Sequence, residues 1–266
     1  MLSHAEFEAL LAFAHRLADL SAEAILPHFR RADGQVDNKA RGGPYDPVTA
    51  ADRGAEEVIR AAVEAAYPSH GIRGEEFGNA REGAEFCWLV DPIDGTRSFI
   101  MGLPVWGTLI GLTCAGEPVL GIMQQPFTGE RYWSGRETAH YRGPEGERTL
   151  RTRACPSIDA AILSTTSPDL FRAGVERDGF ERLSVAARMR RFGGDCYGYC
   201  QLAAGHIDLI VEAGLRAFDI VALIPIVERA GGRLTDWEGG PANDGGRVIA
   251  CGDPRLLPTA LARLAG

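Results

Sequence analysis

Apolar residues recur every three or four positions in two stretches near the start of the chain. In the first stretch, the spacing from Phe7 to Leu20 predicts an amphipathic helix that continues to about Phe29. In the second, the same pattern predicts a helix from about residue 50 to residue 67. Between them, residues 30–48 contain five glycines and prolines, so we expect a loop there.

Short apolar runs separated by turn residues replace the helical pattern after residue 70. The run at residues 86–90 indicates a buried strand. Pro92 should end that strand or leave it at a sheet edge, because proline cannot donate to a sheet ladder. Further strands are predicted at residues 108–112, 119–125, 130–133, 139–142 and 149–153. Short turns join them, so we expect an antiparallel meander.

Extended and helical patterns alternate in the second half of the chain, which favours a layered α/β architecture. We expect Pro225 to kink a long helix, because it cannot donate an intrahelical hydrogen bond. We divide the chain into an N-terminal α+β region, residues 1–153, and a C-terminal α/β region, residues 154–266, that completes the site. Strands are predicted at 161–165, 188–192, 209–212, 233–236 and 247–251, and helices at 168–174, 179–187, after Gly194 to Ala203, 219–230 and from 254 onward.

The composition is that of an ordinary soluble globular protein, with 45% apolar and 24% charged residues in a chain of 266. The net charge of -8 and the lack of a basic tail argue against nucleic-acid binding, which needs a cationic surface. No apolar run approaches about 18 residues, so we expect no transmembrane helix. The N-terminus does not resemble a secretory signal. Six scattered cysteines without a CxxC pair indicate buried thiols in a reducing cytoplasm.

Two aspartates follow the predicted strand at residues 86–90. Asp91 and Asp94 lie within four residues, and Arg97 is the only cation close to them in sequence. Carboxylates at the end of a buried strand need a metal ion, a proton or a basic partner. Oxygen ligands of this kind favour magnesium. The alternative is that both aspartates belong to a turn, as Asp-Gly pairs commonly do.

Two more acidic groups stand beside apolar segments. Glu75 and Glu76 follow a short extended segment, and Asp219 opens an apolar helical pattern. Asp52 lies in the first turn of the second predicted helix, where the helix dipole by itself would account for a negative charge. The three acidic groups at Glu75 and Glu76, at Asp91 and Asp94, and at Asp219 all lie next to apolar segments. They are therefore difficult to explain as solvated surface.

Four stretches together resemble the motif set of the inositol monophosphatase superfamily, whose members are magnesium-dependent, lithium-sensitive phosphatases. The stretches are residues 46–52 (DPVTAAD), 74–76 (GEE), 91–99 (DPIDGTRSF) and 217–221 (AFDIV). Within the superfamily, residues 96–99 (TRSF) and 104–108 (PVWGT) are most similar to histidinol-phosphate phosphatases. The resemblance implies an αβαβα sandwich, a homodimer, and two or three Mg²⁺ ions in each active site.

The same resemblance assigns roles to individual residues. One ion would be held by Glu75, Asp91 and the Ile93 carbonyl, and a second by Asp91, Asp94 and Asp219. A third, weaker ion would use Glu75. The attacking nucleophile would be a metal-activated water, positioned by Thr96. Asp52 would hydrogen-bond Thr96, and Glu76 would be a further helper.

Residues on the substrate side follow from the same comparison. The backbone N–H groups of Gly95 and Thr96 would bind phosphate, and Arg97 would contact phosphate or neutralise the acidic cluster. Lys39 would belong to a lid or simply be solvated. Asp195, Glu212 and Asp219 would face the substrate, and a carboxylate at 195 suits a cation better than a polyol. Asp195 could instead only cap the helix after Gly194.

These assignments predict an enzyme that hydrolyses the small phosphate monoester L-histidinol phosphate during histidine biosynthesis. The alternatives with the same chemistry are phosphatases of inositol phosphate, fructose bisphosphate or a nucleotide 3'-phosphate. A catalytically inactive, metal-dependent scaffold is a further alternative. We expect neither a nucleic-acid nor a membrane partner.

Overall fold

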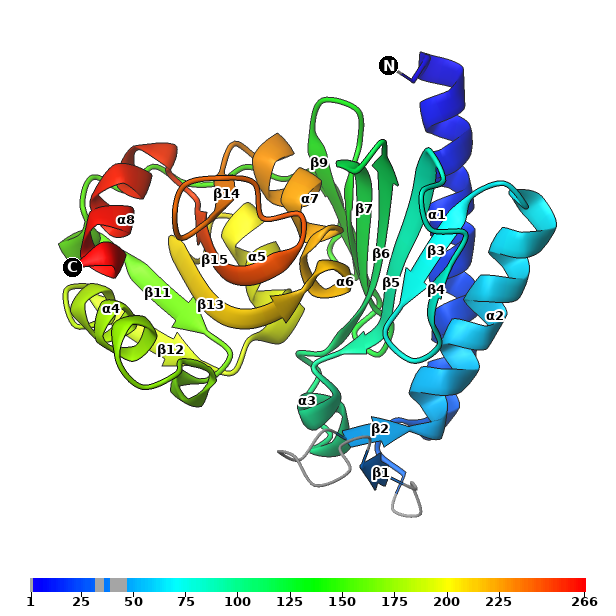
Figure 1. Ribbon diagram of the computed structural model, residues 1–266, viewed down its shortest axis with the longest axis horizontal. Helices are drawn as coiled ribbons and strands as arrows, with labels where there is room; N and C mark the ends of the chain where they lie inside the picture. Colours follow the sequence, from blue (N-terminus) through cyan, green and yellow to red (C-terminus); the bar gives the residue numbers. More distant parts are fainter. Residues whose placement is uncertain (1, 32–35, 39–46) are drawn as a thin grey trace.

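Helices and sheets alternate in five layers, which makes the fold an αβαβα sandwich (Figure 1). The computed structural model describes residues 2–31, 36–38 and 47–266, so Lys39 lies outside the described residues. The first layer consists of α1 (His4–Ile25) and α2 (Ala50–Ala66), followed by a larger sheet, three middle helices, a smaller sheet and two outer helices.

The two long helices are held at their N-termini by reciprocal side-chain caps. Ser3 and Glu6 form a capping box at α1, and Thr49 and Asp52 form one at α2. The short turn η1 (Leu26–His28) continues α1. The buried stripes of both helices pack on the larger sheet, around Trp88.

The larger sheet has eight strands, and most of it is the predicted antiparallel meander. Only β3 and β5 pair in parallel. In spatial order the strands are β10 (Gly146–Thr149), β9 (Ala139–Gly143), β8 (Glu130–Ser134), β7 (Glu117–Gln125), β6 (Gly107–Cys114), β5 (Phe86–Asp94), β3 (Gly71–Gly74) and β4 (Gly78–Ala80). The strand predicted at 149–153 is wrong: the tight turn that pairs Gly146 with Gly143 starts β10 earlier.

Strand β5 does not end at Pro92 but runs on to Asp94. Its pairing with β3 stops at Val90, and beyond that point it pairs only with β6, through a register shift between Asp91 and Asp94. Pro92 therefore sits in a bulge, where its missing N–H breaks no ladder. On the side facing β3, the strand is unpaired at Pro92. The prediction that the proline lies at a sheet edge is therefore confirmed for that side only.

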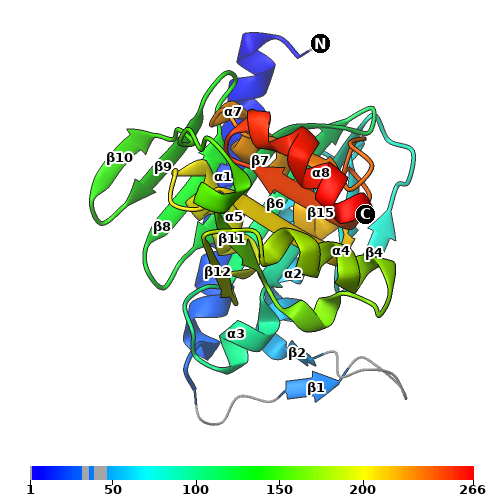
Figure 2. The same ribbon diagram turned by 90° about the vertical axis from the view of Figure 1, so that its left-hand side faces the viewer.

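The smaller sheet has five strands of mixed direction and lies between the middle and outer helices (Figure 2). In spatial order these are β12 (Met189–Phe192), β11 (Ile162–Thr165), β13 (Leu209–Arg216), β15 (Gly245–Cys251) and β14 (Arg233–Asp236). β11 pairs in parallel with β12 and β13, and the other pairs are antiparallel. The outer helices α4 (Val175–Ser184) and α8 (Leu257–Ala265) cover its far face.

The middle layer contains α5 (Asp195–Ala203), α6 (Ala217–Ile220) and α7 (Leu223–Arg229), packed between the two sheets. The helix predicted at 219–230 is two helices, broken at residues 221–222. Pro225 explains the break, because it has no N–H to donate to the carbonyl of Val221. The expected kink is thus a complete interruption.

Several other boundaries differ from the prediction. Residues 30–48 are not all loop, because β1 (Val36–Asn38) pairs with β2 (Pro47–Thr49). The helix expected at 168–174 is only the 3₁₀ turn η3 (Pro168–Leu170), and α4 starts earlier than residue 179, after Gly174 with a positive φ of 90°. The remaining short elements are α3 (Thr96–Ile100), η2 (Ile158–Ala160) and η4 (Pro254–Leu256).

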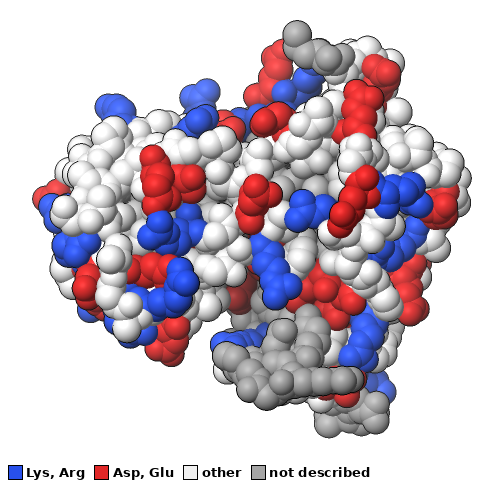
Figure 3. All heavy atoms as spheres, in the orientation of Figure 1, with Lys and Arg blue, Asp and Glu red and all other residues white. Residues whose placement is uncertain are grey.

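The visible surface mixes charges of both signs. Acidic and basic side chains alternate over the face drawn in Figure 3, in keeping with the modest net charge of -8. Among the described residues, no helix combines the length and apolar character needed to cross a bilayer.

Candidate active site

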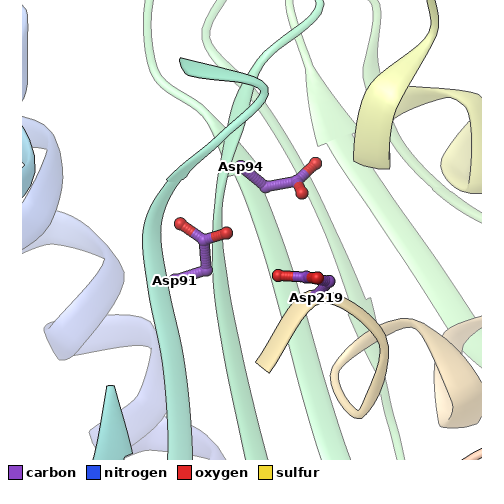
Figure 4. Close-up of side chains that lie close together, drawn as sticks. All are labelled: Asp91, Asp94 and Asp219. Carbon is purple, nitrogen blue, oxygen red and sulfur yellow. The ribbon is translucent and has the colours of Figure 1, made fainter. Parts of the chain in front are cut away.

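The bulge in β5 turns two aspartates toward the same space. In a regular strand, residues three apart point to opposite faces of the sheet. The register shift between Asp91 and Asp94 changes this, and both carboxylates face Asp219 of α6 (Figure 4). The Oδ1 atom of Asp91 also accepts the N–H of Ile93 at 3.0 Å, which stabilises the bulged backbone.

The bulge is supported from behind by two buried hydroxyl groups. Thr108 Oγ1 donates to the carbonyl of Pro92 at 2.8 Å and lies 2.9 Å from Ser21 Oγ on α1. Since the single hydroxyl proton of Thr108 is used on Pro92, Ser21 is the donor to Thr108. Both side chains are fully buried. Helix α1 thereby braces the strand that carries the aspartates.

Asp91, Asp94 and Asp219 form a compact acidic cluster. Each offers a carboxylate oxygen, and these oxygens lie within 4.8 Å of one another. Asp219 also accepts the N–H of Arg216 at 2.7 Å at the start of α6. Burial, followed by the charge of neighbouring carboxylates, raises the pKa of both Asp91 and Asp94 well above the usual range. A cation bound among the three would relieve this repulsion.

Glu75 lies beside this cluster, in the turn between β3 and β4. It is not one of the three clustered residues, but its charge raises the pKa of both Asp91 and Asp52. It is therefore placed between β5 and α2. The Ile93 carbonyl, the other predicted ligand on this side, accepts the hydroxyl of Thr96 at 3.1 Å.

Asp52 is not hydrogen-bonded to Thr96 as the resemblance implies. Its Oδ2 atom accepts the backbone N–H of Thr49 at 2.8 Å and also the Thr49 hydroxyl, so it is used as a helix cap. Thr96 instead bonds Ile93, because both belong to the turn that starts α3. Asp52 Oδ1 is buried without a partner among the described residues, and burial raises the pKa of Asp52 to about 6. An orphaned carboxylate oxygen beside an acidic cluster favours a bound water or ligand there.

Gly95 and Asp195 meet where α3 and α5 begin. Gly95 has a φ of 85° and leads into α3, and a Cβ at this position would lie 3.0 Å from Asp195 side-chain atoms. Asp195 Oδ2 accepts the hydroxyl of Ser98 at 2.6 Å, and its backbone has a φ of 43°, rare outside glycine. Burial raises the pKa of Asp195, whereas the Ser98 hydroxyl and the charge of Arg97 lower it.

The alternative that Asp195 only caps α5 is wrong. The N-cap of α5 is Gly194, with no capping side chain, and the N–H of Cys196 is bonded at 2.7 Å to Asp94 Oδ2. Asp94 thus links the acidic cluster to the start of α5. The charge of Asp195 in turn raises the pKa of Asp94, which places both in one neighbourhood.

Glu212 faces the same neighbourhood from β13 and is buried. It accepts the N–H and hydroxyl of Thr166 at 2.7 and 3.0 Å and the hydroxyl of Thr165 at 3.3 Å. Despite these bonds, burial raises the pKa of Glu212 to about 8. The charges of Glu212, Asp94 and Asp219 also act on Tyr199, whose buried hydroxyl has no partner among the described residues.

Several further residues near this site were not singled out from the sequence. Thr165, Thr166 and Tyr199 gave no local signal, because their role depends on contacts with distant segments. Ser98 lies inside the DPIDGTRSF stretch, and a buried glutamate, Glu56, lies four residues after Asp52 on the same helical face. That i, i+4 spacing was a usable signal.

The comparisons with known proteins agree on one family. The model of the inositol monophosphatase family matches residues 6–265. The chain is 42% identical over 242 residues to the bifunctional phosphatase IMPL2, chloroplastic, of Arabidopsis thaliana, covering 90% of this chain and 67% of that protein. It is 34% identical to a histidinol-phosphatase of Mycobacterium tuberculosis, covering 90% and 92%. A solved inositol monophosphatase from Zymomonas mobilis superposes with a TM-score of 0.86 at 44% identity, covering 97% and 98%.

Proposed function

Because the chain belongs to the inositol monophosphatase family of metal-dependent phosphatases, we propose that it hydrolyses L-histidinol phosphate to L-histidinol, with Mg²⁺ as cofactor. The observation that carries this choice of substrate is the pair of carboxylates of Asp195 and Glu212 beside the acidic cluster. Histidinol phosphate carries an ammonium group and an imidazole, which such carboxylates would bind. The relatives named histidinol-phosphatase support the same choice.

The oxygen-rich cluster suits Mg²⁺ in its ligand type. In the proposal, Asp91, Asp94 and Asp219 hold one ion, and Glu75, Asp91 and the Ile93 carbonyl hold another, with Glu75 available to a third. The Ile93 carbonyl has a second lone pair, so its bond from Thr96 leaves it able to act as a ligand. When bound, the metal would neutralise phosphate charge and lower the pKa of an attacking water.

The chain's own residues would handle the proton and the phosphate. Asp52 has an oxygen without a hydrogen-bond partner among the described residues and a pKa of about 6, so it can accept a proton near neutral pH. We propose that Asp52 acts together with Thr96 and Glu75 on the attacking water. The backbone N–H groups of Gly95 and Thr96 would bind phosphate oxygens, and Arg97 would add a positive charge.

Substrate choice depends on the electrostatics of Glu212 and Asp195. Burial raises the pKa of both groups, and the negative charge of Asp195 raises the pKa of Glu212 further. A cationic substrate would favour their ionised forms, whereas a polyol would leave the negative charges uncompensated. The proposal therefore predicts tighter binding of a cationic monoester. We also propose that the protein is a cytoplasmic homodimer, as the family resemblance implies.

Inositol phosphate is the competing substrate, because a solved inositol monophosphatase is 44% identical to this chain. The test compares kcat/KM for histidinol phosphate, inositol 1-phosphate, fructose 1,6-bisphosphate, adenosine 3',5'-bisphosphate and p-nitrophenyl phosphate with Mg²⁺. Asp195→Asn removes the charge but keeps the shape. It should reduce kcat/KM for histidinol phosphate about 10–100-fold, the value of a charged hydrogen bond, and spare p-nitrophenyl phosphate. If histidinol phosphate is turned over no faster than the other substrates, its assignment as the substrate is wrong.

A further inference from the structure

Helix α2 holds the turn between β3 and β4 through one buried carboxylate. The turn comprises residues 75–77, between the paired residues Gly74 and Gly78. Glu56 Oε2 accepts the N–H of Glu76 at 2.7 Å, and Oε1 accepts the N–H of Phe77 at 3.1 Å. The glutamate has 0% exposure. The backbone of the turn is therefore fixed to α2.

Arg60, one helical turn further along α2, completes this clamp. Its Nε atom donates to Glu56 Oε1 at 2.7 Å, and its guanidinium also bonds the carbonyl of Gly78. The cation compensates the buried charge of Glu56, which would otherwise be costly. The two side chains thus hold successive parts of the turn. Glu56 accepts the N–H groups of Glu76 and Phe77, and Arg60 donates to the carbonyl of Gly78.

The sequence of the turn is adapted to this contact. A Cβ at Gly74 would lie 2.0 Å from Glu56 Oε1, so no other residue leaves the carboxylate in place. Glu75, the next residue, lies close enough to Asp52 and Asp91 for its charge to raise the pKa of each. The held turn consequently sets where the Glu75 carboxylate lies between α2 and β5.

We propose that Glu56 is a positioning residue for the metal site, acting through Glu75 by holding the turn that carries it. This inference rests on the proposed function, in which Glu75 is a metal ligand. Residues that orient metal ligands typically change metal affinity or activity about 10–100-fold when replaced. A purely structural glutamate would change stability and leave the affinity for the ion unaltered.

The experiment measures Mg²⁺ binding by calorimetry, without substrate, and thermal unfolding in EDTA. Glu56→Gln should weaken Mg²⁺ binding about tenfold or more. Asp208→Asn is the matched control, because Asp208 is also a buried carboxylate that accepts hydrogen bonds from one arginine and from a backbone N–H. It lies at the start of β13, about 20 Å or more from α6 at the other end of that strand. The control should change Mg²⁺ affinity less than about twofold while lowering the unfolding temperature.

A double variant separates positioning from stability. In a Glu75→Gln background, adding Glu56→Gln should weaken Mg²⁺ binding no further, although it still lowers the unfolding temperature. Gly74→Ala is the second route, because it displaces the carboxylate without changing any charge, and it should weaken binding in the same direction. Wild-type Mg²⁺ affinity in folded Glu56→Gln, or in folded Gly74→Ala, overturns the inference. Absence of Mg²⁺ binding and phosphatase activity in the unaltered protein would instead overturn the proposed function itself.

Discussion

Two regions of this molecule hold their buried carboxylates in opposite ways. Around the outer helices and the neighbouring ends of β13 and β15, three buried carboxylates are each paired with an arginine: Asp208 with Arg153 at 2.6 Å, Asp253 with Arg255 at 2.5 Å, and Glu176 with Arg172. The hydrogen bonds from the arginines lower the pKa of Asp253 and Glu176 below the usual range. These pairs hold chain segments together.

Where β5 meets α6, the arrangement is the opposite. Among the described residues, Asp91 and Asp94 form no ion pair with lysine or arginine, and the bonds they accept come from backbone N–H groups. Burial and mutual repulsion raise the pKa of both. Such crowding destabilises the protein without metal and leaves oxygen atoms available to a cation. The arginine pairs favour stability, whereas the crowded carboxylates suit the metal binding that we propose.

The largest expected effect comes from exchanging a charge for an amide in each region. Asp94→Asn should reduce phosphatase kcat/KM about 10²–10³-fold or more, because a proposed metal ligand and its charge are lost. The same change should stabilise the protein in EDTA by about 1–3 kcal/mol, since one repelling charge is removed. Steady-state kinetics and urea unfolding measure the two quantities.

Asp208→Asn is the control in the other region. It should cost about 2 kcal/mol of unfolding free energy, the value of a charged hydrogen bond, and leave kcat/KM of the folded protein unchanged. If Asp94→Asn retained activity, or if it destabilised the metal-free protein as much as Asp208→Asn does, the contrast between the regions would not hold.

An intermediate effect is expected from pH. In the metal-free protein the pKa of Asp52 is raised to about 6 and that of Glu212 to about 8, above unfolded values of about 4. Between about pH 4.5 and 8 the folded state thus binds more protons than the unfolded state, so stability falls as pH rises. In EDTA, the unfolding temperature should fall by about 5 °C or more between pH 5.5 and 8.

Magnesium should reverse this trend, because protons compete with the ion for the same oxygens. The gain in unfolding temperature on adding Mg²⁺ should be larger at pH 8 than at pH 5.5. Glu212→Gln should flatten the slope in EDTA by removing one titrating group. A stability in EDTA that rises from pH 5.5 to 8 would contradict the raised pKa values.

The smallest expected effect tests the brace behind the bulge. Ser21→Ala removes the hydroxyl that donates to Thr108 and should cost about 1 kcal/mol of stability. Because the bulge aims Asp91 and Asp94, kcat/KM should also fall about two- to tenfold. Ser184→Ala in α4 is the matched control, since Ser184 is also buried in a helix but lies in the arginine-paired region. Equal kinetic effects of the two variants would mean that the brace has no role in aiming the aspartates.

Local patterns predicted most elements but misplaced those that depend on distant partners. The periodicity of α1 and α2 and the meander from β6 to β9 were correctly predicted, because each is specified by neighbouring residues. Two strand boundaries were misplaced because pairing overrides the pattern: β10 is set by the turn at Gly143, and β5 continues past Pro92 because β6 still pairs with it. The division of one long helix into α6 and α7 was signalled by Pro225, whose missing N–H acts locally.

The sequence by itself determined which short stretches carry carboxylates and which family motifs they resemble, since spacing and residue type are local properties. Only the tertiary structure decided that Asp91 and Asp94 face Asp219, that Asp52 caps α2 with one of its oxygens, and that Glu56 holds the turn before β4. The physical reason is that these facts are contacts between segments far apart along the chain. The direction of a carboxylate follows from the bulge, the packing and the hydrogen bonds around it, which no periodicity along the chain records.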